Sequence, residues 1–206
     1  HLSERAIDER GAEPWFRAIP IQRAYTRRIL TAVGSMCNRS LACHDVGCGI
    51  GQCLAELQHR GFHVLYGCDV EETYIGISRW VLRELHVPAC LTVRNGCDYV
   101  AGLAPSEAGM VLMLNWTYRL ELSGFLQLLK NAKSALDPDG VLFVDVMRRD
   151  WPAQMGMEQG VWYQNYPLNW SGNEAQAAFA SLGFRVLSCW GRFSFARQVY
   201  ALTVSR

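Results

Sequence analysis

The residues of this chain best suited to chemistry are three glycines at alternate positions, preceded by an acid. They stand in the run Asp45-Val46-Gly47-Cys48-Gly49-Ile50-Gly51, between an apolar stretch at 41–44 and an amphipathic stretch at 52–60. Glycine adopts backbone conformations that other residues avoid, and the start of a helix presents unpaired N–H groups. A strand that breaks on such glycines and re-enters a helix predicts a loop lying close against a nucleotide-like ligand.

Two details of this loop narrow the ligand. A dinucleotide fingerprint places a third glycine or an alanine where this chain has Gln52. Asp45 stands at the entrance of the loop, where a carboxylate offers nothing to a pyrophosphate but attracts a cation. The loop therefore predicts a site for a positively charged nucleoside derivative rather than for NAD.

Three further segments carry polar residues where buried strands are expected to end. Asp69 ends the strand expected at 62–68, 18 residues past Gly51, where an acid can accept from both hydroxyls of a ribose. The run Asn95-Gly96-Cys97-Asp98-Tyr99 follows the strand expected at 89–94. The buried strand at 110–114 ends in Asn115-Trp116. With the glycine loop, these segments make four elements of one nucleoside site.

In their order and spacing the four segments resemble the class I S-adenosylmethionine (SAM)-dependent methyltransferases, over roughly positions 40–206. The resemblance implies that SAM is the cofactor, that an acid of the third segment receives the adenine amino group, and that a neighbouring side chain packs the ring. Independently of the resemblance, two expectations hold for the N-terminal segment: an aromatic lid of Trp15, Phe16 and Tyr25 across the cofactor mouth, or a helix that covers the sheet edge. The cofactor-binding residues implied are Tyr25, Asp45, Gly47, Cys48, Gly49, Gly51, Asp69, Val70, Asp98, Tyr99, Asn115 and Trp116.

Catalysis with SAM needs few protein groups. The sulfonium makes its attached carbons electrophilic, so a protein has to bind the cation, exclude water and align a nucleophile with the breaking carbon–sulfur bond. Relatives that methylate planar amines carry an N-P-P-Y type run where this chain has Asn115-Trp116-Thr117-Tyr118, and the loss of both prolines disfavours that chemistry. The aromatic segment 151–170 either forms a wall for the acceptor or closes the core. The candidate catalytic residues are Asn115, Tyr118, Tyr163 and Tyr166, and the acids Asp145 and Asp150 are weaker candidates for a base.

Three functions are compatible with this site. The first is methylation of a small-molecule acceptor. The second is suggested by a resemblance to small bacterial proteins that use SAM alone, in which the α-amine displaces the sulfur to give azetidine-2-carboxylate and methylthioadenosine. Such an enzyme needs a tight aromatic pocket and a polar residue, here Asn115, to aim the amine. The third is a SAM-binding partner without turnover.

The elements that must position these residues alternate as strand and helix, which predicts a three-layer α/β sandwich. The resemblance implies a seven-stranded, mostly parallel sheet whose last strand is antiparallel. We expect one domain, 1–206, with a helical cap or lid at 1–40 and a Rossmann-like core at 41–206. Helices are expected at 73–85, 122–136 and, after a capping box at Ser171, up to 182; later strands are expected at 141–146, 184–190 and 198–204, with a turn at 137–140.

Composition narrows the partners. The chain of 206 residues has 20 basic and 19 acidic residues, a net charge of +1, and its arginines are scattered rather than clustered. We therefore expect a small-molecule substrate and neither nucleic acid nor membrane as partner. The eight cysteines form no C-x-x-C pair and the five histidines no metal constellation, which predicts reduced core thiols, no metal and a cytoplasmic location. The oligomeric state is open.

Overall fold

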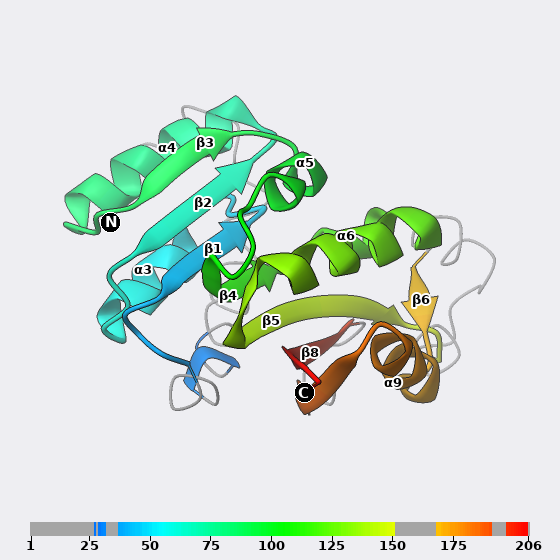
Figure 1. The fold of residues 1–206 in the computed structure, drawn as a ribbon. Helices are drawn as coiled ribbons and strands as arrows, with labels where there is room; N and C mark the ends of the chain where they lie inside the picture. Colours follow the sequence, from blue (N-terminus) through cyan, green and yellow to red (C-terminus); the bar gives the residue numbers. More distant parts are fainter. Residues whose placement is uncertain (1–26, 28, 32–36, 151–167, 191–196, 206) are drawn as a thin grey trace.

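The computed structural model describes residues 27, 29–31, 37–150, 168–190 and 197–205 (Figure 1). Strands and helices alternate along the described chain, as the hydrophobic pattern predicts. The strands are β1 (Ala42–Val46), β2 (Leu65–Asp69), β3 (Cys90–Val93), β4 (Ala108–Met113), β5 (Leu136–Arg148), β6 (Asn169–Trp170), β7 (Phe184–Trp190) and β8 (Arg197–Val204). The helices are α3 (Gln52–His59), α4 (Glu72–Glu84), α5 (Gly96–Ala101), the 3-10 turn η1 (Thr117–Arg119), α6 (Leu122–Ala135) and α9 (Gly172–Ser181).

The strands form one mixed sheet in the order β3-β2-β1-β4-β5-β8-β7, with β6 paired to the end of β5. β1, β2, β3, β4 and β5 run parallel, and β8 runs antiparallel to β5 and to β7. The expected seven strands with an antiparallel last strand are confirmed, and the two-residue β6 is an addition. Because the chain order reverses beside β1, the carboxyl ends of β1 and β4 flank a crevice where α/β proteins bind ligands.

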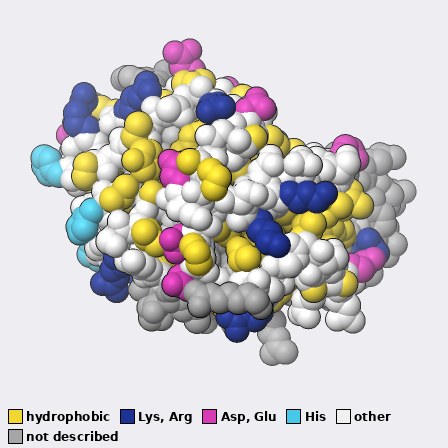
Figure 2. Space-filling view, in the orientation of Figure 1, with side chains coloured by type: hydrophobic (Ala, Val, Ile, Leu, Met, Phe, Trp, Pro, Cys, Tyr) yellow, Lys and Arg dark blue, Asp and Glu magenta, His cyan; other side chains and the backbone are white. Residues whose placement is uncertain are grey.

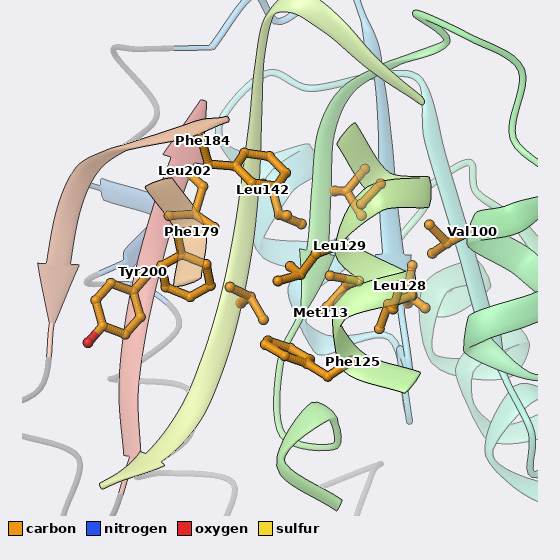
Figure 3. Packing of buried hydrophobic residues seen from close by; sticks show 14 of the residues in the cluster. Val100, Met113, Phe125, Leu128, Leu129, Leu142, Phe179, Phe184, Tyr200 and Leu202 are labelled. Carbon is orange, nitrogen blue, oxygen red and sulfur yellow. The ribbon is translucent and has the colours of Figure 1, made fainter. Parts of the chain in front are cut away.

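Helices cover both faces of the sheet, which gives the expected three layers (Figure 1). On one face α5, α6 and α9 pack through Val100, Phe125, Leu129 and Phe179 onto strand residues such as Tyr200, all nearly inaccessible to solvent (Figure 3). On the opposite face, a second cluster unites side chains of α3 and α4 with β1 and β4. The two cores fix the strand ends that carry the polar residues.

Local signals in the sequence predicted most helix ends. The capping box at the start of α9 forms as expected, with the Ser171 hydroxyl and the Glu174 carboxylate each accepting from the other residue's backbone N–H. The turn expected at 137–140 lies inside β5 instead, because Leu136 already pairs with Ala108 before a shift in register. The short helix α5 was not predicted, and it begins at Asn95, whose side chain accepts from the backbone N–H of Cys97.

The N-terminal segment is described at residues 27 and 29–31, which are helical. Ile29 and Leu30 are buried in the core cluster that contains α3, and Arg27 forms an ion pair with Glu56 of α3 at 3.0 Å. These residues pack with α3 on a face of the sheet, whereas the sequence suggested a lid or a helix over the sheet edge. The proposed lid residue Tyr25 lies outside the described residues.

Candidate functional site

A cavity of about 640 Å³ opens at the carboxyl ends of β1, β2, β3 and β4. Its volume lies within the range of roughly 300–1,000 Å³ that is usual for small-molecule sites. All four segments singled out in the sequence contribute to it. The residues around it are Asp45, Gly47, Cys48, Gly49, Ile50, Gln52, Cys53, Asp69, Val70, Glu71, Tyr74, Asn95, Gly96, Cys97, Leu114, Asn115, Trp116, Arg119 and Leu120.

The glycine loop is held against β2 by its backbone. The N–H groups of Gly47 and Cys48 both donate to the carbonyl of Cys68, at 2.8 and 2.9 Å. Gly47, Gly49 and Gly51 all have positive φ, at 78°, 52° and 81°, a region that side-chain-bearing residues rarely adopt. Gly51 does not line the cavity but caps α3 in the left-handed conformation. Gly47 and Gly49 lie at the cavity, whereas Gly51, expected among the cofactor-binding residues, is a correction because it forms the start of α3.

Asp69 is anchored through both of its carboxylate oxygens. One oxygen accepts from the N–H of Gly49 at 2.9 Å, and the other accepts from the N–H of Glu71 at 3.0 Å. A carboxylate has about four lone-pair sites, so roughly two remain for a ligand. Asp69 therefore ties the glycine loop to the end of β2 and keeps acceptors available on the cavity side. Glu71 adds a second acid to this end of the cavity.

Asp45 places a buried carboxylate against the cavity. Its side chain is only 3% exposed, and its Oδ2 has no hydrogen-bond partner among the described residues. Burial, with a smaller contribution from the nearby Asp69 charge, raises the pKa of Asp45 to about 7. An unpartnered buried acid is costly in the absence of a counter-charge, so the site favours a cationic group here.

Trp116 closes over the loop. Its indole Nε1 donates to the main-chain oxygen of Val46 at 2.6 Å. A Cβ at Gly47 would lie 2.6 Å from the indole Cδ1, and a Cβ at Gly96 would lie 3.0 Å from the far end of the ring. The ring therefore fills the space that two glycines leave free, and it lines the cavity from the β4 side.

Asn115 is fixed by a buried polar cluster that includes Asp145 and Arg197. Its backbone has a φ of 73°, and its N–H donates to Oδ2 of Asp145 at 2.8 Å. The guanidinium of Arg197 donates to Oδ1 of Asn115 and lies 3.4 Å from Oδ2 of Asp145. The Thr117 hydroxyl donates to the Asp145 carbonyl and lies 3.1 Å from its carboxylate. Asp145 is therefore a support for Asn115 rather than an exposed base.

The ionisation of Asp145 follows from this setting. The side chain is fully buried, and this desolvation raises its pKa, while the Arg197 charge and the hydrogen bonds from Asn115 and Thr117 act in the opposite direction. Because Arg197 faces Asp145, the two charges largely compensate each other inside the protein. Sequence reasoning missed Arg197, which approaches from β8, 82 residues away.

Several predicted site residues lie elsewhere. Tyr99 is a correction: its hydroxyl lies 2.9 Å from Nδ1 of the buried His44, and its ring packs in the core rather than in the cavity. Asp98 is exposed and does not line the cavity, because α5 turns it away; Asn95, Gly96 and Cys97 take its place. Tyr118 is buried beside Arg197 and also does not line the cavity.

Of the aromatic segment 151–170, the structure describes residues 168–170. Trp170, expected in the acceptor wall or the core, lies in the core with its ring edge-on to Phe125 and Phe179. The candidate catalytic residues Tyr163 and Tyr166 lie outside the described residues. Sequence reasoning also missed Tyr74, Arg119 and Leu120, which line the cavity from the element after each strand end.

Comparisons with known proteins identify the fold. No family model matches the chain, and no curated protein matches it in sequence. Among solved structures, the chain is similar to the magnesium protoporphyrin IX methyltransferase of Synechocystis PCC 6803 with bound S-adenosylhomocysteine (SAH). The two chains are 15% identical, the match covers 97% of this chain and 96% of that one, and the TM-score is 0.71.

Two further solved structures agree. A SAM-dependent methyltransferase from Clostridium acetobutylicum ATCC 824 is 11% identical over 96% of this chain and 99% of its own, with a TM-score of 0.72. The 1,6-didemethyltoxoflavin-N1-methyltransferase of Burkholderia thailandensis, with bound 1,6-didemethyltoxoflavin and SAH, is 14% identical. That match covers 100% of this chain and 88% of the other, and its TM-score is also 0.72. The chain has the class I methyltransferase fold. At these identities the likeness concerns the fold alone.

Two negative findings apply to the described part of this methyltransferase-like fold. No three His, Cys, Asp or Glu side chains there are grouped so as to hold a metal ion. Within the same residues, no helix has the length and apolar character needed to cross a membrane. The face in Figure 2 intersperses Lys and Arg with Asp and Glu.

Proposed function

We propose that the protein binds SAM in the cavity beside the glycine loop and transfers its methyl group to a small-molecule acceptor. The observation that carries this proposal is the buried carboxylate of Asp45, whose Oδ2 has no partner among the described residues, beside the glycine loop and the anchored Asp69. A nucleoside that is also a cation suits all three features: the buried acid, the glycine loop and the anchored Asp69. The similar structures from Synechocystis and Burkholderia contain SAH, which supports the same ligand for this fold.

The residues of the cavity fit SAM part by part. Asp69, with Glu71 beside it, would accept from the ribose hydroxyls. Val70, just after β2, and Cys97, in the α5 helix that follows β3, would flank the adenine. Asp45 would face the positively charged methionine portion, and the glycine loop would allow the backbone to approach it. SAM supplies an electrophilic methyl group, while the protein excludes water and aligns the acceptor.

The reacting end of the cavity lies at Asn115 and Trp116. Planar-amine methylation uses an asparagine oxygen to accept from the amine, but Oδ1 of Asn115 already accepts from Arg197. This contact agrees with the missing prolines in disfavouring such acceptors. Cyclisation of SAM also needs an acceptor to aim the α-amine, and Oδ1 of Asn115 keeps one of its two lone pairs beside Arg197. We propose methyl transfer rather than cyclisation because the similar structures from Synechocystis and Burkholderia are methyltransferases. A small acceptor suits the cavity and the mixed-charge surface of Figure 2.

Titration calorimetry with SAM, SAH and NAD⁺ tests the proposal. We expect the parent protein to bind SAM and SAH and not NAD⁺. Asp69→Ala should weaken both nucleosides by about ten- to a hundredfold, equivalent to about 1.5–3 kcal/mol, because a charged acceptor for the ribose is lost. Glu84→Ala, an acid at the exposed end of α4, is the matched control and should leave both affinities unchanged. A folded parent that binds neither SAM nor SAH would refute the proposed function.

A further inference from the structure

Arg119 is the one basic residue among the described residues that line the cavity. It lies at the end of η1, next to Leu120, and it is exposed. Its backbone N–H donates to the Trp116 carbonyl, but its guanidinium has no hydrogen-bond or ion-pair partner within the described part of the chain. Arg197 differs, because Asp145 faces its charge. Among the described residues, Arg119 therefore brings to the cavity a positive charge that no ion pair compensates.

Asn115 presents a hydrogen-bond donor to the same region. A guanidinium only donates, so the Asn115 amide atom that faces Arg197 must be the oxygen. The amide nitrogen is then turned away from Arg197, and it donates to no group among the described residues. It is not a buried unsatisfied atom either. Asn115 lines the cavity, and its NH₂ has no acceptor within the described part of the chain, so it can donate to a carboxylate or phosphate oxygen of a ligand.

The two donors lie at the end of the cavity away from the ribose site. Asp69 ends β2 and Glu71 follows it, whereas Asn115 and Arg119 follow β4, on the other side of β1 in the sheet. The acids at the β2 end repel an anion, and the cation and the amide at the β4 end attract one. The charge along the cavity is therefore divided: the acids lie at the β2 end, where the SAM ribose is proposed to bind, and the positive charge lies at the β4 end.

We propose that the acceptor is an organic anion whose carboxylate or phosphate is bound by the Arg119 guanidinium and the Asn115 amide nitrogen. This inference rests on the proposed function, since it names the class of molecule that shares the cavity with SAM. A guanidinium binds planar or tetrahedral oxyanions through charge-assisted hydrogen bonds, and Arg197 fixes the amide so that its donor faces the same group. Both side chains bind the anion and fix the orientation of the acceptor; neither exchanges a proton with it.

Small aromatic probes test the proposal on the SAH-loaded protein. Binding of benzoate, phenyl phosphate and neutral benzamide is measured by ligand-observed NMR titration. We expect at least one of the two anions to bind at least tenfold more tightly than benzamide, and Arg119→Gln to remove that advantage. Arg83→Gln, an exposed arginine of α4, is the matched control and should keep it. Equal binding of all three probes, or none, would overturn the proposal.

A second measurement determines whether Arg119 binds an anion of the acceptor or the carboxylate of SAM itself. Titration calorimetry with SAH and with methylthioadenosine, which lacks the amino-acid portion, is carried out on the parent and on Arg119→Gln. Unchanged affinity for both ligands, within about twofold, supports an anion site for the acceptor. A loss confined to SAH would assign Arg119 to the cofactor carboxylate and overturn the proposal.

The two proposals fail in different ways. If the parent binds no SAH, the proposed function fails, whatever the probes show. If the parent binds SAH but Arg119→Gln binds the anionic probe as the parent does, only the inference on the acceptor fails. Circular dichroism of Arg119→Gln excludes unfolding as the cause of a loss, and Arg119→Lys, which restores the charge without the fork of donors, should recover part of the anion affinity.

Discussion

The indole nitrogen of Trp116 and the carbonyl of Val46 lie 2.6 Å apart, and this hydrogen bond joins the end of β4 to the start of the glycine loop. The two residues are 70 positions apart in the chain. The bond holds the ring against Gly47, so the loop and the reacting end of the cavity form one unit. A disturbance at either residue should therefore affect ligand binding as well as stability.

Gly47→Ala tests this unit. The new Cβ would lie 2.6 Å from the indole Cδ1 at a φ of 78°, so the ring or the loop must move. We expect the free energy of unfolding to fall by about 1–3 kcal/mol and SAH affinity to fall at least tenfold. Chemical denaturation and calorimetry measure the two effects. In Gly76→Ala the added Cβ meets no atom within 4 Å in α4, so this control should be neutral or stabilising, with SAH binding unchanged.

Gly49→Val tests whether a side chain at this position interferes with the ligand without colliding with protein atoms. A Cβ at Gly49 meets no protein atom within 4 Å, yet Gly49 lines the cavity with a φ of 52°. A branched side chain there is strained and occupies the place of the ligand, so we expect SAH binding to be lost. Unimpaired SAH binding by a folded Gly49→Val protein would show that this loop is not the cofactor cradle.

Asp45 should make SAM binding depend on pH. Its pKa of about 7 in the ligand-free protein means that the acid is largely protonated at pH 6 and largely ionised at pH 8. A cation binds the ionised form better, so SAM affinity should rise by about tenfold between these pH values. Asp45→Asn should lose this rise, and since it keeps the ionisation of SAM itself, it isolates the contribution of Asp45. The same pH dependence in both proteins would contradict the assignment.

Stability of the ligand-free protein should show the opposite trend. The folded-state pKa of Asp45 lies above its ordinary value of 3.8, so folding favours the protonated acid. Its contribution to stability is full below about pH 4, and it is lost as the pH rises towards about 7. Denaturation curves at pH 5 and pH 8 should therefore differ less for Asp45→Asn than for the parent. SAM should narrow the difference in the parent, because its positive charge compensates the ionised acid.

The thiols around the glycine loop should be structural. Burial raises the pKa of Cys48 and of Cys97, so neither is a thiolate at neutral pH. Cys48→Ala together with Cys97→Ala should leave SAM-dependent turnover within a few-fold of the parent, although both residues line the cavity. A collapse of the rate with unchanged melting temperature and SAH affinity would instead reveal a cysteine nucleophile.

The order of the predicted strands placed four of the expected site residues around one cavity, and their binding of SAM stays a prediction. Asp45, Asp69, Asn115 and Trp116 lie around one cavity because parallel strands deliver their carboxyl ends to one edge, which the order of segments already implies. The adenine assignment to Tyr99 failed because the sequence pattern did not reveal α5. Asn95 is the N-cap of α5, so Tyr99 lies one helical turn further along, where its side chain packs into the core.

The support of Asn115 was beyond sequence reasoning. Arg197 meets Asn115 only because β8 inserts between β5 and β7, and the register of that antiparallel pair places Arg197 opposite Met147. No local pattern near either residue encodes that register. Arg119 was missed for a different reason: an arginine after a buried strand reads as a solvated residue, and only the cavity distinguishes it from the scattered arginines elsewhere.

Incubation with SAM alone decides between methyl transfer and cyclisation, and it needs no acceptor. In cyclisation the α-amine nitrogen bonds to the γ-carbon, the bond from that carbon to sulfur breaks, the nitrogen loses a proton, and methylthioadenosine leaves. Azetidine-2-carboxylate and methylthioadenosine would then form in equal amounts. We expect neither above the background measured without protein, because methyl transfer, the proposed function, requires a second molecule as acceptor.

The matching experiment adds candidate acceptors and resolves the products by mass. A methyltransferase releases SAH only when its acceptor is present, and the divided charge of the cavity directs the search towards small carboxylates and phosphates. With such an acceptor, Arg119→Gln should raise KM at least tenfold while kcat changes little, because an anion held equally in the ground and transition states contributes uniform binding. Release of methylthioadenosine and azetidine-2-carboxylate by the parent, lost in Asp69→Ala, would replace methyl transfer by cyclisation. Arg119 and Asn115 would then have to bind the carboxylate of SAM itself, since no second molecule would enter the cavity.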